Sequence, residues 1–281
     1  MSQKLKEKNL DQRKLSKLRK YLIIIALIIA FIVGLGLTFN QQIRDIVLQH
    51  NSDSAMRMIK KNTDPRKSKI AKKNKSLDEL KREYAEALKR GDLALAKKLA
   101  AEIKKKQGGS YDWSKVKPMS TGQAINAATH SHEDGMGAIA IPSVGMYLPI
   151  VAGVSNESLS VGGGTFWEAQ SMKYSNNYPL AGHALSPYGK LFSKIADTSI
   201  GEYIFTTDFN NIYTYRIYEN TNIEPTDTGV VNMDTTHNGH RIITLLSCSF
   251  GGEKRTLVRG DLVKVQPSTK KLLKIFQNIW Y

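Results

Sequence analysis

The runs HRIITLLSC (residues 240–248) and RTLVRGDLVKVQP (residues 255–267) decide the fold class of this chain. Both are rich in β-branched and apolar residues, and six residues that include two glycines separate them. Two such runs around a short glycine-containing connection are typical of a β-hairpin. We therefore expect two antiparallel strands, with Cys248 at the end of the first and Arg255 at the start of the second.

Upstream of this hairpin the sequence has the same pattern of short strand-forming runs. Short β-branched or aromatic runs alternate with Gly, Pro, Asn and Asp: GAIAIP (137–142), MYLPIVAG (146–153), SLSVGGGTF (158–166), NYPLAGHAL (177–185), GEYIFTTD (201–208) and NIYTYRIYENTNIEP (211–225). INAATH (125–130) and YGKLFSKIA (188–196) are candidate short helices. About eight strands with few helices predict a mostly β domain over residues 111–281, built as a single barrel or sandwich.

The segment YLIIIALIIAFIVGLGLTF (residues 21–39) has nineteen residues and no charged side chain. A helix of this length spans about 28 Å, close to the thickness of a bilayer core. It is longer than the apolar part of a typical signal peptide, and no clear cleavage site follows it, so we predict an uncleaved transmembrane signal-anchor. Eight Lys and Arg residues lie within residues 1–20, whereas residues 40–57 carry only Arg44 and Arg57. The positive-inside rule therefore places the leader, residues 1–20, in the cytoplasm and the remainder outside.

Residues 40–110 are polar and lysine-rich, which is typical of a solvated extracellular linker or stalk. From Leu77 to Ile103, however, apolar residues recur mostly every three, four or seven positions, so we expect a helix over about 77–106 that Gly91 interrupts. Such a helix is either a spacer or an element that self-associates or docks on the following domain. We expect residues 1–110 to set the location of the protein and not its chemistry.

Charge is distributed unevenly along the 281 residues. The net charge of +16 lies entirely within the first 110 residues, because residues 111–281 carry fourteen basic and fourteen acidic side chains. Nucleic-acid binding would need a basic face on the folded domain, so we expect no nucleic-acid partner. The basic stalk would instead be attracted to a membrane with anionic lipids or to a wall polymer.

The chain has one cysteine, so Cys248 is either a buried structural thiol or a nucleophile. A nucleophilic thiolate needs a base or a cation nearby. In the expected hairpin, Arg255 lies at the same end as Cys248, whereas Arg259 lies about 13 Å further along the strand. Among the histidines, His183 stands out because it ends the apolar run YPLAGH, where Gly182 permits a close backbone approach.

The other histidines carry weaker signals. His130 and His132 form a possible metal pair, but no third and fourth ligand follows at a firm spacing, so we expect no metal site. His237 and His240 fall in a polar segment that precedes the cysteine strand, which is typical of a solvated loop.

In combination, LAGH (180–183), GKLF (189–192), TLLSC (244–248) and VRGDL (258–262) strongly resemble the motifs of the sortases, the cysteine transpeptidases of Gram-positive surfaces. The resemblance runs from about Tyr111 to the C-terminus, and the histidine, cysteine and arginine motifs occur in the right order with matching flanks. Ser247 stands where the family usually has a threonine, so the hydroxyl is kept and a methyl group is lost. The N-terminal anchor and the short tail after the last strand are most similar to the class A, housekeeping sortases.

The resemblance implies an eight-stranded sortase-type β-barrel with short helices, preceded by the transmembrane helix and the helical stalk. It implies that Cys248 is the nucleophile, His183 the general acid and Arg255 the donor to the developing oxyanion. It also maps two apolar positions that line the substrate groove onto Ala181 and Leu246, with Ser247 beside them.

A further wall of the groove is expected in the segment EPTDTGVVNMDTTHNG (224–239), which leads into the cysteine strand. Its apolar residues Val230, Val231 and Met233 would contact the leucine and proline of a sorting signal. The corresponding connection shapes signal recognition in sortases, which agrees with this interpretation.

The resemblance implies a substrate, a reaction and a location. Sortases cut an LPXTG-like sorting signal of a surface protein between Thr and Gly, and a thioacyl-enzyme then passes the chain to an amine, here expected to be that of a lipid-linked peptidoglycan precursor. The protein would be a single-pass protein of the cell membrane with its catalytic domain outside. No cofactor is implied, and calcium dependence is left open. The alternatives are a related cysteine hydrolase that releases free acid and a membrane-tethered basic binding protein.

Overall fold

The computed structural model describes residues 2–61, 69–107, 120–127, 135–185, 190–248 and 253–276. Within these ranges, the side chains of residues 2–17, 58–61, 69–75, 107, 127, 185, 190 and 248 fall outside the description. The chain forms two compact units, Met1–Arg44 and Asp45–Tyr281.

The first unit consists mainly of the helix α1 (Ser2–Thr38). Its part Leu18–Thr38 is long and apolar enough to cross a membrane, and the side chains of this part are exposed. This span overlaps residues 21–39, which the sequence predicts as an apolar helix. A helix whose apolar side chains are not packed against protein needs another apolar environment, since water solvates such a surface poorly.

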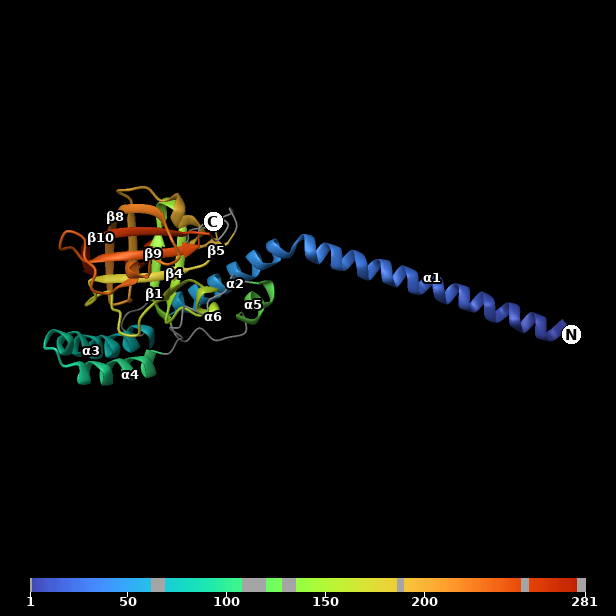
Figure 1. The fold of residues 1–281 in the computed structure, drawn as a ribbon, viewed down its shortest axis with the longest axis horizontal. Helices are drawn as coiled ribbons and strands as arrows, with labels where there is room; N and C mark the ends of the chain where they lie inside the picture. The colour runs from blue at the N-terminus through green and yellow to red at the C-terminus, as the bar shows by residue number, and fades with distance from the viewer. Residues whose placement is uncertain are drawn as a thin grey trace. The chain divides into compact units, whose positions relative to one another are not determined.

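The second unit is built around a closed barrel of eight strands, which confirms the expected barrel (Figure 1). The order around the barrel is β1 (Gly135–Ile141), β2 (Met146–Val151), β3 (Gly163–Thr165), β4 (Asn177–Gly182), β9 (Ile242–Cys248), β10 (Arg255–Pro267), β8 (Asn211–Ile223) and β7 (Tyr203–Thr207). Each strand run predicted from the sequence overlaps one of these strands. Short helices lie between the strands: α6 (Asn156–Leu159) and the 3-10 helices η2 (Pro142–Val144), η3 (Phe192–Asp197) and η4 (Thr228–Val231). A last 3-10 helix, η5 (Leu272–Phe276), follows β10.

Strand pairing in the barrel is antiparallel except for β2 with β3 and β4 with β9, which pair in parallel. β9 and β10 form the expected hairpin, and β8 pairs with β10 over most of its length. β4 and β9 pair in parallel, although more than fifty residues separate them in the sequence. β5 (Ala184–Leu185) and β6 (Lys190–Leu191) make a separate two-stranded sheet just beyond β4.

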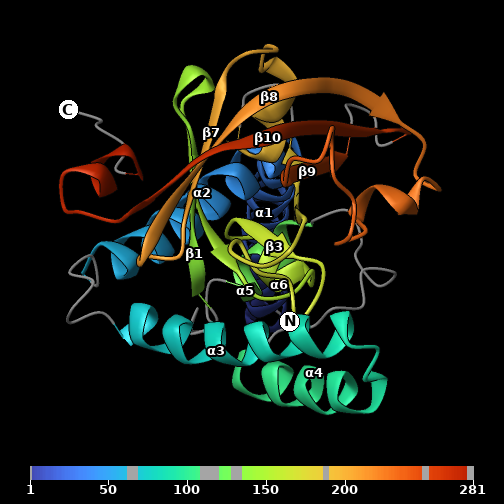
Figure 2. The same cartoon turned by 90° about the vertical axis from the view of Figure 1, so that its left-hand side faces the viewer.

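The helical region before the barrel differs from the single helix expected over residues 77–106. Two helices, α3 (Lys69–Lys89) and α4 (Leu93–Gln107), lie side by side as a hairpin (Figures 1 and 2). Gly91 between them has a φ of +73°, a conformation that glycine adopts without strain. Asp92 then caps α4, because its carboxylate accepts a hydrogen bond from the Leu95 N–H at 3.0 Å. The expectation of one interrupted helix is therefore wrong, since the Gly-Asp pair ends one helix and starts another.

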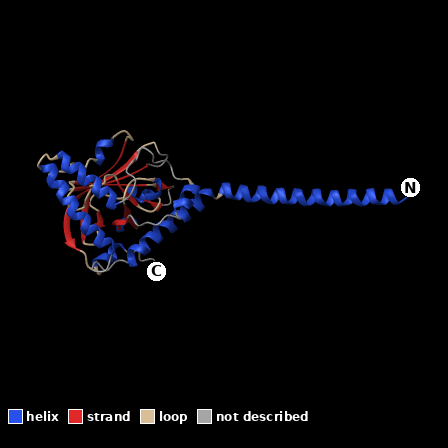
Figure 3. Cartoon of the chain, turned by 90° about the horizontal axis from the view of Figure 1, so that it is seen from below, coloured by secondary structure: helices blue, strands red, loops and turns tan. Residues whose placement is uncertain are grey.

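The helices of residues 45–127 pack on the barrel instead of standing apart as a solvated stalk. Leu48 of α2 (Asn40–Lys61), Leu77 of α3 and Ile103 of α4 are at most 2% exposed. They belong to the same apolar cluster as barrel residues such as Ile139 and Leu180. Figure 3 shows these helices around the strands of this unit. The sequence-based boundary at residue 110 thus falls inside a compact unit, because the apolar stripe of the helices is covered by the barrel.

Candidate active site

The hairpin of β9 and β10 brings the cysteine and arginine positions together. Arg255 is the direct antiparallel partner of Cys248, as expected from the sequence. Residues directly opposite each other in such a ladder have Cα atoms about 4.5–5.5 Å apart. Arg255 is half-buried, and its Nη1 donates a hydrogen bond to the Lys254 carbonyl at 3.1 Å. The side chain of Cys248 lies outside the described residues, so its place follows from the backbone.

The histidine position reaches the same end of the barrel through the parallel pairing of β4 with β9. Ala181 pairs with Leu246 and Gly182 pairs with Ser247, so His183 is level with Cys248. Neighbouring strands are about 4.8 Å apart, which makes these two positions close neighbours across the sheet. His183 is only 6% exposed.

Gly182 and Phe192 fix the end of β4. A Cβ atom on Gly182 would lie 2.2 Å from Cγ of Phe192, so only glycine fits beside this ring. The Phe192 N–H donates a hydrogen bond to the His183 carbonyl at 3.0 Å, and the Phe192 side chain is fully buried. The close approach anticipated from the sequence at Gly182 is therefore an approach of η3, and it anchors the backbone of His183.

Side-chain alternation assigns the three positions to one face of the sheet. Leu180, Leu245 and Val258 are part of the barrel core. Because successive residues of a strand point to opposite faces, positions 183, 248 and 255 fall on the face opposite that core. The three positions thus meet at one edge of the barrel, on one face.

An apolar cluster continues along this face from the three positions. It consists of Val154, Leu159, Phe166 and Val231, with Ala181, Val230 and Leu246 packed against it. Four of the residues expected to line the groove are therefore brought together: Ala181, Leu246, Val230 and Val231. The last two belong to the 3-10 helix η4.

Two of the expected groove residues lie elsewhere. Ser247 is 4% exposed and alternates with Leu246, so it falls on the core side of β9. Met233 lies near the start of β4, where its carbonyl accepts from the Asn177 N–H at 2.8 Å and its sulfur from Ser175 Oγ at 3.9 Å. The start of β4 is about 17 Å from its end, where His183 follows.

Contacts that the sequence did not reveal hold η4 in place. The indole Nε1 of Trp167 donates to the Val231 carbonyl at 2.8 Å. Nδ2 of Asn177 donates to the carbonyls of Val230 at 3.1 Å and Asn232 at 3.0 Å. No sequence pattern marks Trp167 or Asn177, because both act through backbone carbonyls that are distant in the chain.

The competing charged groups occupy other places. Arg259 is opposite Thr244, and its Nη1 lies 3.5 Å from Oε2 of Glu219, which agrees with the expectation that it does not reach Cys248. His237 contacts Asp261 at 2.9 Å and stacks on Tyr218. Asp261 is level with the start of β9, which is about 20 Å from Cys248.

His130 and His132 lie outside the described residues. Within the described ranges, no three His, Cys, Asp or Glu side chains form a group that could hold a metal ion. The candidate site therefore consists of the cysteine, histidine and arginine positions and the apolar cluster beside them.

Comparisons with known proteins show the family to which this fold belongs. The sequence model of the family described as "Sortase domain" matches residues 139–263. Sortase A of Streptococcus agalactiae is 32% identical over 268 residues, which cover 92% of each chain. Sortase A of Listeria monocytogenes is 33% identical over 178 residues, 62% of this chain and 78% of its own.

A solved structure shows the same fold. The crystal structure of sortase C-3 from Streptococcus pneumoniae has a TM-score of 0.50 at 15% identity and covers 72% of this chain and 89% of its own. With the 32% identity to a sortase A along nearly the whole chain, the barrel, the site and the sequence support one conclusion. The chain belongs to the sortase family.

Proposed function

We propose that this sortase, a cysteine transpeptidase, cleaves an LPXTG-like sorting signal between Thr and Gly and joins the surface protein to the amine of a lipid-linked peptidoglycan precursor. The observation that carries the proposal is the register of β4, β9 and β10, in which positions 183, 248 and 255 are level. Enzymatic activity is common to the family, so the alternative of a tethered binding protein is set aside.

In the first step, the Cys248 thiolate attacks the carbonyl carbon of the substrate threonine. His183, as imidazolium, gives its proton to the leaving amine of the glycine while the C–N bond breaks. The guanidinium of Arg255 donates charge-assisted hydrogen bonds to the oxyanion that forms on the carbonyl oxygen. The product of this step is a thioester between Cys248 and the threonine.

In the second step, the acceptor amine attacks the thioester carbonyl. Its proton passes to the now neutral His183, the C–S bond breaks, and the thiolate of Cys248 is regenerated. Free Cys and His have pKa values of about 8.5 and 6.5, so thiolate and imidazolium coexist in a minority of molecules at neutral pH unless the site shifts these values.

Substrate recognition is assigned to the apolar cluster beside the three positions. Ala181, Leu246, Val230 and Val231 offer an apolar surface to the leucine and proline of the signal. The half-buried state of Ala181, Val230 and Leu246 supports this role, because a substrate would bury what the free protein leaves partly accessible.

The apolar part of α1 supports a location in the cell membrane. Leu18–Thr38 would anchor the protein in the cell membrane as a single span, with the basic leader in the cytoplasm and residues 45–281 outside. Because Cys248 is the only cysteine, labelling of intact cells with a membrane-impermeant maleimide tests this orientation. Labelling only after lysis would place the catalytic unit on the wrong side for a surface enzyme.

The deciding experiment for the reaction is mass spectrometry of an LPXTG peptide incubated with the enzyme and triglycine. We expect the ligated peptide. Release of free acid alone would identify a hydrolase, and no product would refute the assigned substrate. Cys248→Ala should abolish all products while His237→Ala, which alters the distant His237–Asp261 pair, should keep them.

A further inference from the structure

Residues 166–176, which we call the β3–β4 segment, connect β3 to β4 and contain no regular helix or strand. Most of its first half is nevertheless buried: Phe166, Ala169, Gln170, Ser171 and Met172 are at most 8% exposed. A connection with so little exposed surface must be covered from more than one side. The covering elements are the α3–α4 hairpin and the groove wall η4.

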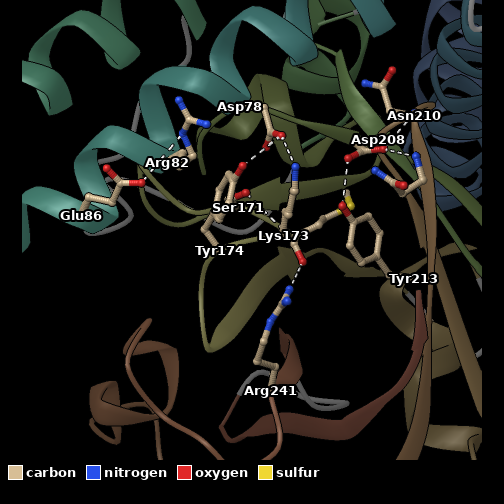
Figure 4. Close-up of polar contacts among 12 residues, drawn as sticks. Asp78, Arg82, Glu86, Ser171, Lys173, Tyr174, Asp208, Asn210, Tyr213 and Arg241 are labelled. Atoms are coloured by element: carbon tan, nitrogen blue, oxygen red, sulfur yellow. Dashed lines mark hydrogen bonds and ion pairs between the residues drawn. The ribbon is translucent and has the colours of Figure 1, made fainter. Parts of the chain in front are cut away.

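The α3–α4 hairpin holds the β3–β4 segment by polar contacts along its length. Lys104 of α4 lies 3.1 Å from Glu168, and Asp78 of α3 lies 3.1 Å from Lys173. Tyr174 Oη also donates to Asp78, at 3.5 Å. Figure 4 shows Lys173 and Tyr174 converging on this carboxylate. Contacts at 168, 173 and 174 restrain the segment at both ends.

Lys81 of α3 makes the central contact. It is 4% exposed, and its Nζ donates to the Gln170 carbonyl at 2.8 Å. It lines a cavity together with Asp78 and Asp208, and burial lowers the pKa of Lys81 to about 7. A buried amine must have a hydrogen-bond acceptor to offset its lost hydration, so Lys81 fixes where the Gln170 carbonyl can be.

The side chain of Gln170 links the Lys81 contact to residues nearer the proposed groove. Its Oε1 accepts from the Trp167 N–H at 3.0 Å, and its Nε2 donates to the Pro179 carbonyl of β4 at 2.8 Å. Trp167 in turn holds the Val231 carbonyl through its indole N–H. A continuous path of hydrogen-bonded residues therefore runs from Lys81 through Gln170 and Trp167 to Val231.

We propose that the α3–α4 hairpin positions the substrate groove through this path, with Lys81 and Gln170 as positioning residues. They touch neither the substrate nor the reacting atoms and act by holding Trp167 and the apolar wall of η4 in place. The proposal rests on the proposed function only in treating the groove as the binding site of the sorting signal. It gives the helices before the barrel a part in binding, where the sequence suggested only location.

The first test measures hydrogen exchange in residues 224–235 and needs no activity. The full chain in detergent carries Lys81→Met, which keeps the volume and removes the hydrogen bond to Gln170. Lys97→Met, at an exposed position of α4, is the matched control. We expect several-fold faster exchange in Lys81→Met and none of this change in Lys97→Met. Equal exchange rates in the two variants would overturn the proposal.

The second test measures kinetics of peptide ligation. Lys81→Met should raise KM about 3- to 30-fold and leave kcat and the rate of Cys248 alkylation by iodoacetamide unchanged. Trp167→Phe, which removes the indole N–H, should also raise KM, and the double variant should be no worse than the weaker-binding single one, because both act on one path. Multiplying effects would show that the two residues act independently and would refute the path.

Two further experimental outcomes can also be interpreted. If Lys81→Met does not fold, Glu168→Ala, which removes the carboxylate that Lys104 contacts, is measured by the same exchange and kinetics. Wild-type values of both would overturn the proposal. If no variant and no wild-type protein ligates the peptide, the proposed function fails. The exchange experiment then still decides whether the hairpin controls the groove wall.

Discussion

Replacing Gly182 by alanine should separate the histidine from the cysteine without touching either residue. The new Cβ would lie 2.2 Å, 2.3 Å and 2.8 Å from three atoms of Phe192, where carbon atoms normally stay about 3.5–4.0 Å apart. Phe192 or the end of β4 must therefore retreat by more than about 1 Å. Phe192 is fully buried and donates to the His183 carbonyl, so either movement displaces the backbone of His183.

The expected cost has two parts. Overpacking of this kind destabilises a protein by about 1–3 kcal/mol. A misplacement of about 1 Å in a catalytic group can cost about 10²-fold in rate. We expect Gly182→Ala to lower kcat/KM by about that factor while the protein still folds.

The assay combines urea unfolding of the purified protein with kcat/KM for ligation of an LPXTG peptide to triglycine. Gly122→Ala is the matched control, because no atom lies within 4 Å of its added Cβ and its φ is not positive. A Gly182→Ala protein with the unfolding midpoint and kcat/KM of this control would refute the reasoning. A large loss of kcat/KM with a small loss of stability would support it.

Three other predictions concern the arginine, the buried lysine and the helices. Arg255→Lys should lower kcat about 10²-fold with little change in KM, because the lysine ammonium lacks the forked donors of a guanidinium. Arg216→Lys, at an exposed position, is the control. Equal kcat values for the two variants would contradict the role of Arg255. Burial lowers the pKa of Lys81 from 10.5 to about 7, so between these values the unfolded chain binds more protons and stability should rise with pH, by up to about 1.4 kcal/mol per unit. Lys81→Met should flatten this rise in urea unfolding at pH 7, 8 and 9, and an unchanged slope would count against the burial of the amine. A protein of residues 45–281 should unfold at the same urea concentration as the full chain. A protein of residues 109–281 should unfold at a clearly lower urea concentration, because burial of Leu48, Leu77 and Ile103 contributes about 1.5–3 kcal/mol each. Equal unfolding midpoints for the two truncated proteins would refute the packing of the helices on the barrel.

Local sequence signals were enough to predict the strands and the cysteine–arginine pair. Each strand combines a short β-branched run with turn residues at its ends, and the β9–β10 hairpin needs only a six-residue connection. Residues that face each other across a short hairpin are fixed by the lengths of the two strands. The approximate relation of Arg255 to Cys248 could therefore be derived before the barrel was known.

Contacts between distant segments were not predictable in the same way. The apolar stripe of α3 and α4 was visible, but a stripe does not say which surface covers it. Gly91 was interpreted as a costly interruption, although Gly followed by Asp is also the signal for one helix end and the next start. Lys81 belongs to a lysine-rich helix, and only the packing of α3 on the barrel distinguishes it from its exposed neighbours.

The histidine is the part of the site that depends most on tertiary structure. Cys248 and Arg255 are joined by a hairpin, whereas His183 meets them only through the parallel pairing of β4 with β9. Hydrogen bonds along β4 and just beyond its end stabilise that pairing. Gln170 Nε2 donates to the Pro179 carbonyl, and Thr244 Oγ1 donates to Asn177 Oδ1 at 2.9 Å. Just beyond β4, the Phe192 N–H donates to the His183 carbonyl.

Damage to these supports should therefore have a different signature from damage to the hairpin. A loosened β4 would leave the thiol beside its arginine and remove the proposed proton donor, so attack on the peptide would fail at expulsion of the amine. Such a variant would still react with a small alkylating agent, because that reaction needs no general acid. The proposed nucleophile and oxyanion donor lie on the most local part of the fold and the proposed acid on the least local part, so loss of tertiary packing is expected to remove acid catalysis first.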